Sequence, residues 1–176
     1  KYHSPRASFV NFLYSILRIL ESIFPIKKDE IENSIKQLEI TRKNICSNNL
    51  KTNNKALNLA LSINEIPLIY YPWGFEAENA KIHAIVEDVV EASHNGIISW
   101  EIKSNVKPIL LQGKNDYEKT KQRWKIFEEY FNENNIEFEK ITSIEGDIIS
   151  KLVNLIYMLD YASIYLAIIN KIDPTP

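Results

Sequence analysis

Residues 107–141 read KPILLQGKNDYEKTKQRWKIFEEYFNENNIEFEKI, and this stretch decides the fold class. It opens with a nearly continuous apolar run, 107–112, which is typical of a strand buried on both faces. It closes with 136–141, where apolar and charged residues alternate as in a less buried strand. The segment between them is a helix, because one face collects Tyr117, Thr120, Trp124, Phe127 and Phe131. Strand, helix and strand at this spacing form a βαβ unit, which predicts a sheet that is at least partly parallel.

The rest of the chain extends this pattern on both sides. A second apolar run, 67–71, predicts another buried strand, and 82–86 predicts a fourth. Helical spacing of apolar residues predicts helices over 6–24, from Asp29 to about Ile45, over 56–63 and over 147–170. The last of these is apolar nearly all round, so another domain or another subunit should help to cover it. The sequence therefore predicts a single α/β domain with a parallel sheet flanked by helices.

Composition excludes several classes of function. The net charge of −2 argues against a nucleic-acid surface, which needs clustered Lys and Arg. A single cysteine, Cys46, allows neither an intrachain disulfide nor a Cys-based metal site. The four glycines are far apart, so the chain has no Gly-rich phosphate loop and no dinucleotide fingerprint. The apolar run 9–24 is short for a membrane span and is interrupted by polar residues, and residues 1–6 show no signal-peptide pattern. We expect a cytoplasmic protein that binds neither membrane nor nucleic acid.

The chemistry-bearing residues gather between Glu78 and Trp100. Ligands of a parallel sheet collect beyond the carboxyl ends of its strands, here near Tyr71, Val86 and Gln112. A carboxylate, Glu78, and an imidazole, His94, together provide the minimum for proton transfer next to a carbonyl. Each residue also has an ordinary explanation, Glu78 as a first-turn acid of a helix and His94 as a surface or capping residue.

Two further sets of residues have alternative explanations. The spacing of His83, Glu87, Glu91 and His94 is compatible with zinc on a helix, but two histidines with two glutamates are an undistinguished ligand set, and His83 fits a packed core position better. We therefore predict no metal site. Arg6 begins the first helix, where the helix dipole does not favour a cation. It is either solvated or faces an anionic intermediate.

Specific motifs resemble a known family. Glu78-Asn79-Ala80-Lys81, followed by His94-Asn95 and Trp100, is similar to the bifunctional phosphoglucose/phosphomannose isomerases, which are SIS-domain enzymes. Ser4-Pro5-Arg6 resembles the segment that opens the second domain of that family. The end of the chain, with Tyr165-Leu166-Ala167 and Asp173-Pro174-Thr175-Pro176, resembles the family's C-terminal signature.

The resemblance implies a flavodoxin-like, three-layer SIS fold in a homodimer whose active sites lie between subunits. It also implies a cofactor-free isomerase for glucose 6-phosphate, mannose 6-phosphate and fructose 6-phosphate. His94, from the neighbouring subunit, would open the sugar ring, and Glu78 would move a proton between C2 and C1 through a cis-enediol. Arg6 would stabilise the developing negative charge. Thr175 is the nearest candidate for the threonine that permits both C2 epimers.

The sequence departs from the family in three places. The resemblance implies an N-terminal SIS domain with a phosphate-gripping Ser/Thr loop, which residues 1–176 do not include. The segment between Tyr71 and Glu78 is shorter than in the family, and the family's catalytic lysine lies beyond Pro176. We therefore expect residues 1–176 to be a C-terminal SIS domain with an opening helix and a C-terminal tail, weak in sugar-phosphate binding and inactive as an isolated fragment. The alternatives are a non-catalytic phosphosugar-binding SIS module that regulates a partner, and a lone α/β domain with a structural role.

Overall fold

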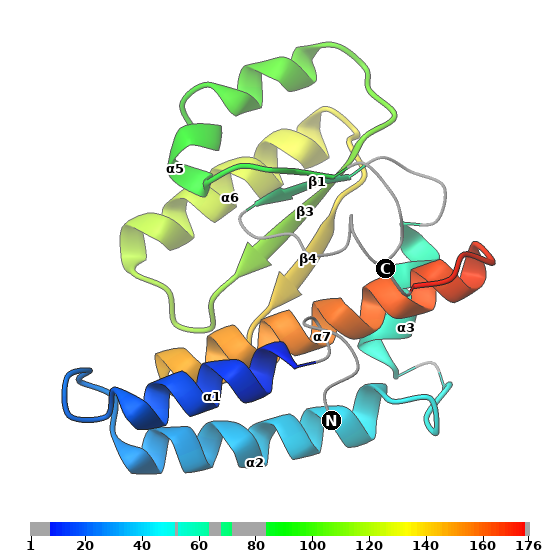
Figure 1. The fold of residues 1–176 in the computed structure, drawn as a ribbon. Coiled ribbons are helices and arrows are strands. Elements are labelled where there is room, and N and C mark those ends of the chain that lie inside the picture. The colour runs from blue at the N-terminus through cyan, green and yellow to red at the C-terminus, as the bar shows by residue number, and fades with distance from the viewer. Residues whose placement is uncertain (1–7, 52, 64–67, 72–83, 175–176) are drawn as a thin grey trace.

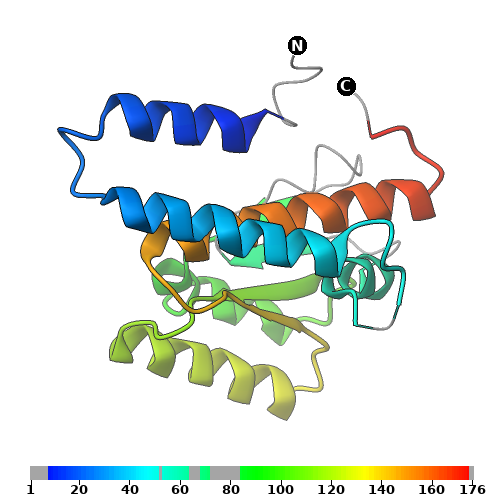
Figure 2. The same ribbon diagram turned by 90° about the horizontal axis from the view of Figure 1, so that it is seen from below.

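The computed structural model describes residues 8–51, 53–63, 68–71 and 84–174, and within them it forms one layered α/β domain (Figure 1). The sheet lies in the middle. One of its faces is covered by α2 (Lys28–Ile45), α3 (Lys55–Ser62) and α7 (Ile148–Ile169), and the other by α5 (Val89–Ala92), the 3₁₀ helix η1 (Gly96–Glu101) and α6 (Glu118–Glu133). Figure 2 shows α1 (Phe9–Ile19) outermost, lying over α2 and α7.

The sheet confirms the parallel arrangement that the sequence predicts. Its strands are β1 (Leu68–Tyr71), β2 (Ala84–Val86), β3 (Lys107–Gln112) and β4 (Glu139–Thr142), in the order β2-β1-β3-β4. All three pairs of neighbouring strands are parallel. The carboxyl ends of the four strands therefore lie along one edge of the sheet.

Strand β3 is buried on both faces, as its apolar run predicts. Ile109 and Leu111 join the core between the sheet and α3 and α7, while Leu110 joins the core under α6. The second core also contains Trp124, Phe127 and Phe131, which confirms the aromatic face of α6. Tyr117 was expected on that face but is 72% exposed, because it precedes the first residue of the helix.

Strand β4 begins three residues later than the alternating pattern predicts. Helix α6 ends in a Schellman motif, in which Ile136 N donates to Phe131 O at 2.8 Å and Asn135 N donates to Asn132 O at 3.3 Å. Asn135 adopts the left-handed conformation that this motif requires, with φ of 54°. Ile136 therefore closes the helix and packs beneath it, and pairing with β3 starts only at Glu139.

The first helix is shorter at its end than the predicted range. Helix α1 ends at Ile19, and the N–H groups of Ile23 and Phe24 both donate to Leu20 O in the turn that follows. Pro25 disfavours the helical conformation for the residue before it, so the chain leaves the helix before Phe24. Residues 6 and 7, where the prediction began, lie outside the described residues.

Helix α7 joins the layers on its side of the sheet. Asn154 Nδ2 donates to Thr41 Oγ1 on α2 at 2.5 Å, and Tyr165 OH donates to Ile45 O at 2.7 Å. Among the described helices, α7 is the one that is long and apolar enough to cross a membrane, with a mean hydropathy of 1.7. However, 56% of its most apolar 18-residue segment is buried inside the domain. It packs against α2, α3 and the sheet, as the core helix of a globular domain does. Helix α7 is thus buried on more than one side by elements of its own domain, and the covering by another domain or subunit stays a prediction.

Candidate functional site

The candidate site begins where β2 ends. After Val86 the chain turns into α5, whose first turn is capped by Asp88: its Oδ1 accepts the N–H of Val90 at 2.8 Å. Val89 and Ala92 on α5 are buried in the core under α6. The short helix is therefore fixed at the carboxyl edge of the sheet by one cap and two apolar anchors.

His94 lies on the turn that follows α5, and its side chain is exposed. The N–H groups of His94 and Asn95 both donate to Glu91 O, at 3.0 and 2.9 Å. The side-chain amide of Asn95 lies 3.5 Å from Glu91 Oε2. The composition His94-Asn95-Gly96 is typical of a turn or a helix end, and the structure places these residues directly after α5. We call residues 93–96 the His94 turn.

The far side of the His94 turn is anchored by η1. Trp100, the tryptophan of the motif, is 6% exposed and packs edge-to-face on Phe131, with ring centroids 5.4 Å apart. The indole is therefore a core residue that fixes η1 against α6. Because α5 and η1 are both anchored, the backbone of the His94 turn has a defined position while the imidazole faces outward.

The carboxylate of Glu87 lies directly against Gly96. A Cβ built on Gly96 would be 2.6 Å from Glu87 Oε1 and 2.7 Å from its Cδ, closer than such atoms come in real structures. Any side chain larger than hydrogen at position 96 would have to push the carboxylate away. The end of β2 and the end of the His94 turn are thus in contact.

Hydrogen bonds hold the loop after β3 in place at the same edge of the sheet. Asp116 Oδ2 accepts the N–H of Gly113 at 2.8 Å and the indole N–H of Trp124 at 3.1 Å. Ser143, which follows β4, donates its N–H to Gln112 O at 2.9 Å, and its Oγ accepts the N–H of Lys114 at 2.7 Å. These bonds hold the loops after β3 and β4 together.

Comparison with known proteins assigns this architecture to a family. Residues 52–176 match the model of the bacterial phospho-glucose isomerase C-terminal SIS domain. The chain belongs to this family. The resemblance to this family is thereby confirmed, and so is the SIS fold that the resemblance implied.

Individual relatives agree with the family. Over 98% of its length the SIS domain is 28% identical to the bifunctional phosphoglucose/phosphomannose isomerase of Caldicellulosiruptor bescii, and it spans 56% of that protein. In fold it resembles a glucose-6-phosphate isomerase like protein from Thermus thermophilus, with a TM-score of 0.72 and 16% identity over 96% of this chain and 58% of the other. The C-terminal domain of glucosamine-fructose-6-phosphate aminotransferase from Francisella tularensis gives a TM-score of 0.54 and 16% identity, over 97% of this chain and 53% of the other.

The predicted site residues are described only in part. His94 lies on the carboxyl edge of the SIS domain, as expected from the end of β2. Glu78, Arg6 and Thr175 lie outside the described residues, so their roles stay predictions. His83 of the alternative zinc set lies outside them as well, and the described part of the chain contains no group of three or more His, Cys, Asp or Glu that could hold a metal ion.

Two bracing residues were not predicted from the sequence. Asp116 was not singled out, although an aspartate three residues after a strand-ending glycine is a common turn signal. Glu87 was considered only as a metal ligand. Its contact with Gly96 depends on how α5 folds back, which composition does not reveal.

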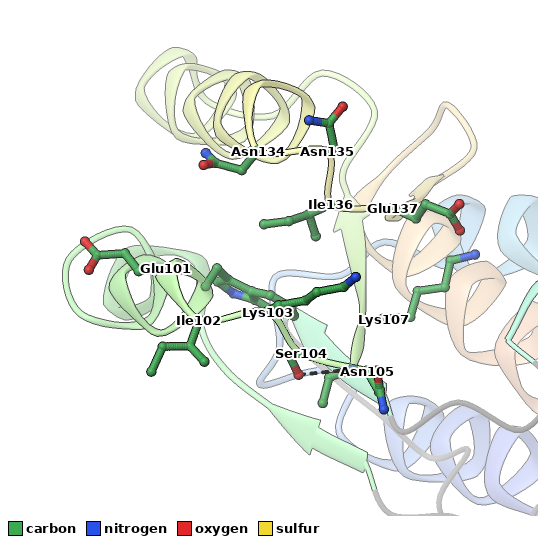
Figure 3. A pocket seen from close by; sticks show the side chains of 12 residues that line it. Glu101, Ile102, Lys103, Ser104, Asn105, Lys107, Asn134, Asn135, Ile136 and Glu137 are labelled. Carbon is green, nitrogen blue, oxygen red and sulfur yellow. Dashed lines mark hydrogen bonds between the residues drawn. The ribbon is translucent and has the colours of Figure 1, made fainter.

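A groove of about 860 Å³ lies at the opposite edge of the sheet (Figure 3). It is formed by residues 100–107 and 134–137, and Figure 3 shows Ile136 and Lys103 pointing into it from different walls. Lys107 at its rim is already paired with Glu139, at 3.1 Å, and with Ser62 O, at 3.2 Å. Since parallel sheets bind ligands at the carboxyl ends of their strands, this groove is not part of the site around His94.

Proposed function

We propose that this SIS domain is part of an aldose–ketose isomerase that interconverts glucose 6-phosphate, and mannose 6-phosphate, with fructose 6-phosphate. The family membership and the relatives support a sugar-phosphate isomerase. The observation that supports the proposal is the position of His94: an exposed imidazole on an anchored turn that follows β2 and α5. An acid/base residue needs this combination of accessibility and fixed position.

In the proposed mechanism the histidine and the glutamate divide the proton transfers. His94 moves the proton between the ring oxygen and the hydroxyl group, which opens the hexose ring. Glu78 then removes the proton from C2 and returns it to C1 through a cis-enediol intermediate, and a carboxylate in a partly dry cleft gains the basicity that this step needs. Arg6 stabilises the negative charge that develops on the oxygen atoms of the intermediate. Thr175 belongs to the part of the site that tolerates both C2 epimers.

The proposal includes a shared active site. Because the His94 side chain faces outward from its own domain, it is available to a site on a second copy, which supports a homodimer in which each site takes its histidine from the neighbouring subunit. The chain spans 56% of the length of its curated relative, so the proposed activity is that of a longer protein. The phosphate-binding residues belong to a preceding SIS domain, and the protein works in the cytoplasm.

A coupled assay on the full-length protein tests the proposal. Fructose 6-phosphate is supplied, and glucose 6-phosphate is detected through the NADP reduction of glucose-6-phosphate dehydrogenase. We expect turnover by the wild type and a fall in kcat of about a hundredfold or more in Glu78→Gln and His94→Gln, which is typical for the loss of a general acid or base. Glu133→Gln is the matched control, because Glu133 is exposed at the end of α6, next to the residues 134–137 that line the groove at the opposite edge of the sheet.

Two results would contradict the mechanism. Full activity of Glu78→Gln would show that Glu78 is not the base. Full activity of His94→Gln would show that His94 does not open the ring. Binding of fructose 6-phosphate without turnover in the wild type would favour the non-catalytic module that regulates a partner.

A further inference from the structure

We propose that a groove between β4 and the helices α2, α3 and α7 binds a nucleobase, carried by a nucleoside or a nucleotide. The groove has a volume of about 740 Å³, which is within the usual range for small-molecule sites. It lies along the free edge of β4, whereas the His94 turn follows β2, the strand at the other edge of the sheet. This second site does not depend on the proposed isomerase activity.

Apolar side chains form the buried part of the groove. Ile45, Leu59 and Met158 belong to the core between the sheet and α7, and Ile141 of β4 packs against that core. Ile40 of α2 is exposed and also lines the groove. The flat faces of a ring that binds here leave water for an apolar surface, which is favourable.

Asn154 on α7 is the most buried polar residue that lines the groove, with 6% of its surface exposed. Its Nδ2 donates to Thr41 Oγ1 at 2.5 Å. Within the described part of the chain, no residue donates a hydrogen bond to its Oδ1. A carboxamide oxygen without a donor is unfavourable at this burial, so a ligand that donates to Oδ1 gains affinity from it.

The free edge of β4 supplies backbone donors and acceptors. The N–H of Ser143 donates to Gln112 O at 2.9 Å, so the odd-numbered residues of this parallel strand face β3. The N–H and C=O groups of Lys140 and Thr142 therefore point away from β3, and both residues line the groove. Among the described strands, none pairs with this edge of β4. Each of these two residues thus offers one donor beside one acceptor.

The charged side chains on β4 are already paired, which favours an uncharged ring. Glu139 Oε1 lies 3.1 Å from Lys107 Nζ. Lys140 Nζ lies 2.9 Å from Glu128 Oε2 on α6, which covers the other face of the sheet, so this ammonium is turned away from the groove. Lys55, at the start of α3, is exposed and lines the groove, where it can meet the phosphate of a nucleotide.

This combination of groups matches a nucleobase. A base has two apolar faces and an edge on which donors and acceptors lie side by side. Carboxamides and backbone peptide groups pair with such an edge, because each carries both a donor and an acceptor. A hydrocarbon would leave Asn154 Oδ1 without a donor. Besides Asn154, four carboxamide residues line the groove: Gln37, Asn44, Asn53 and Asn58.

Isothermal titration calorimetry on the full-length protein tests the site, with the four common ribonucleosides and their 5′-monophosphates as probes. We expect at least one nucleoside to bind saturably, with one molecule per chain. Equal affinities of this nucleoside and its monophosphate would identify a nucleoside site. A monophosphate that binds at least about fivefold tighter, with the gain lost in Lys55→Ala, would identify a nucleotide site. No saturable binding of any probe would overturn the proposal.

Two variants place the bound probe in the groove. Asn154→Leu removes the buried acceptor and should weaken binding by about tenfold or more, as expected for the loss of a buried hydrogen bond. Asn44→Trp puts a large side chain into the groove from an exposed position on α2, and it should abolish binding without disturbing the core. Lys36→Trp is the matched control, because Lys36 is exposed on α2 and does not line the groove. Unchanged affinity in Asn44→Trp would overturn the proposal even if Asn154→Leu does not fold.

Backbone amide resonances give a readout that is specific to the edge of β4. The N–H resonances of Lys140 and Thr142 should shift on addition of the nucleoside more than those of Glu139 and Ile141, which point toward β3. Shifts confined to other parts of the chain would overturn the proposal.

Excess fructose 6-phosphate should leave nucleoside binding unchanged, because the two ligands occupy different sites. Displacement of the nucleoside by fructose 6-phosphate would place it in the site around His94 and overturn the proposal of a second site. If the full-length protein does not turn over sugar phosphates, the proposed function fails. The binding of nucleosides and its loss in Asn44→Trp then still decide whether the groove is a nucleobase site.

Discussion

The indole Nε1 of Trp124 donates to Asp116 Oδ2 across 3.1 Å, and the same oxygen accepts the N–H of Gly113 at 2.8 Å. One carboxylate oxygen thus ties the loop after β3 to the buried face of α6. Trp124 is 5% exposed, so its indole N–H has little access to water as a replacement partner. The hydrogen bond from the buried Trp124 indole to Asp116 therefore fixes the loop after β3.

Removal of this carboxylate should destabilise the domain. In Asp116→Ala the Trp124 indole N–H and the Gly113 N–H lose their acceptor, so we expect the free energy of unfolding to fall by about 2–3 kcal/mol. Asp116→Asn keeps an acceptor oxygen and should lose less than half of that. Urea unfolding followed by tryptophan fluorescence measures both variants. Equal stability of Asp116→Ala and the wild type would show that water replaces the carboxylate.

Asn54 is a second buried polar residue on which stability should depend. Its Oδ1 accepts the N–H of Leu57 at 2.9 Å and caps α3, while its Nδ2 donates to Asn49 O at 2.8 Å and to Ile45 O at 3.2 Å. Asn54→Ala removes the cap and leaves the carbonyls of Ile45 and Asn49 with fewer donors, so we expect a loss of about 2–4 kcal/mol. The adjacent Asn53 is exposed, and Asn53→Ala should change stability by less than about 0.5 kcal/mol. Similar thermal unfolding curves for the two variants would contradict this role.

Asp147 should make the stability of the domain depend on pH in the acidic range. Burial alone would raise the pKa of Asp147, but the N–H of Ser150, at 2.7 Å, and its hydroxyl, at 3.0 Å, outweigh burial, and the pKa lies below its usual value. A lowered pKa means that the ionised cap stabilises the fold above the unfolded-state pKa of about 3.9. That contribution is lost as the pH falls through the lower pKa of the folded state.

The matched variant for this prediction is Asp147→Asn, which still caps a helix but carries no charge. We expect it to be less stable than the wild type at pH 7, and the difference should shrink as the pH falls from about 5 to 2. Urea midpoints at each pH measure the difference. A difference that stays constant, or grows in acid, would show that the charge of Asp147 does not contribute.

Much of the sheet was predictable because two of its strands, β1 and β3, are nearly continuous apolar runs. The bounds of β3 agree with the prediction residue by residue, since every position between Lys107 and Gln112 is buried and the glycine after it ends the run. The late start of β4 was not predicted, because it depends on the left-handed conformation of Asn135. The Asn134-Asn135 pair was the available signal, since asparagine tolerates that conformation better than other residues with a side chain.

The candidate site was less predictable than the fold. The turn at His94 followed from the local sequence. Trp100 belonged to the motif, but its role as a core anchor was not predicted. The approach of the Glu87 side chain to Gly96 did not follow, because these residues come together only when the chain turns after α5. Tertiary contacts of single side chains leave no periodic pattern in a sequence.

The packing of α7 determines when the rest of the chain can become stable during synthesis. Asn154 meets Thr41 across 113 positions, and Tyr165 meets Ile45 across 120. Helices α2 and α3 therefore leave the ribosome well before the surface that buries them exists, and such long-range closures are slow. A nascent chain that stops before α7 would display these apolar helix faces to chaperones and proteases, and premature termination late in translation would yield an unstable product rather than a slightly shortened domain.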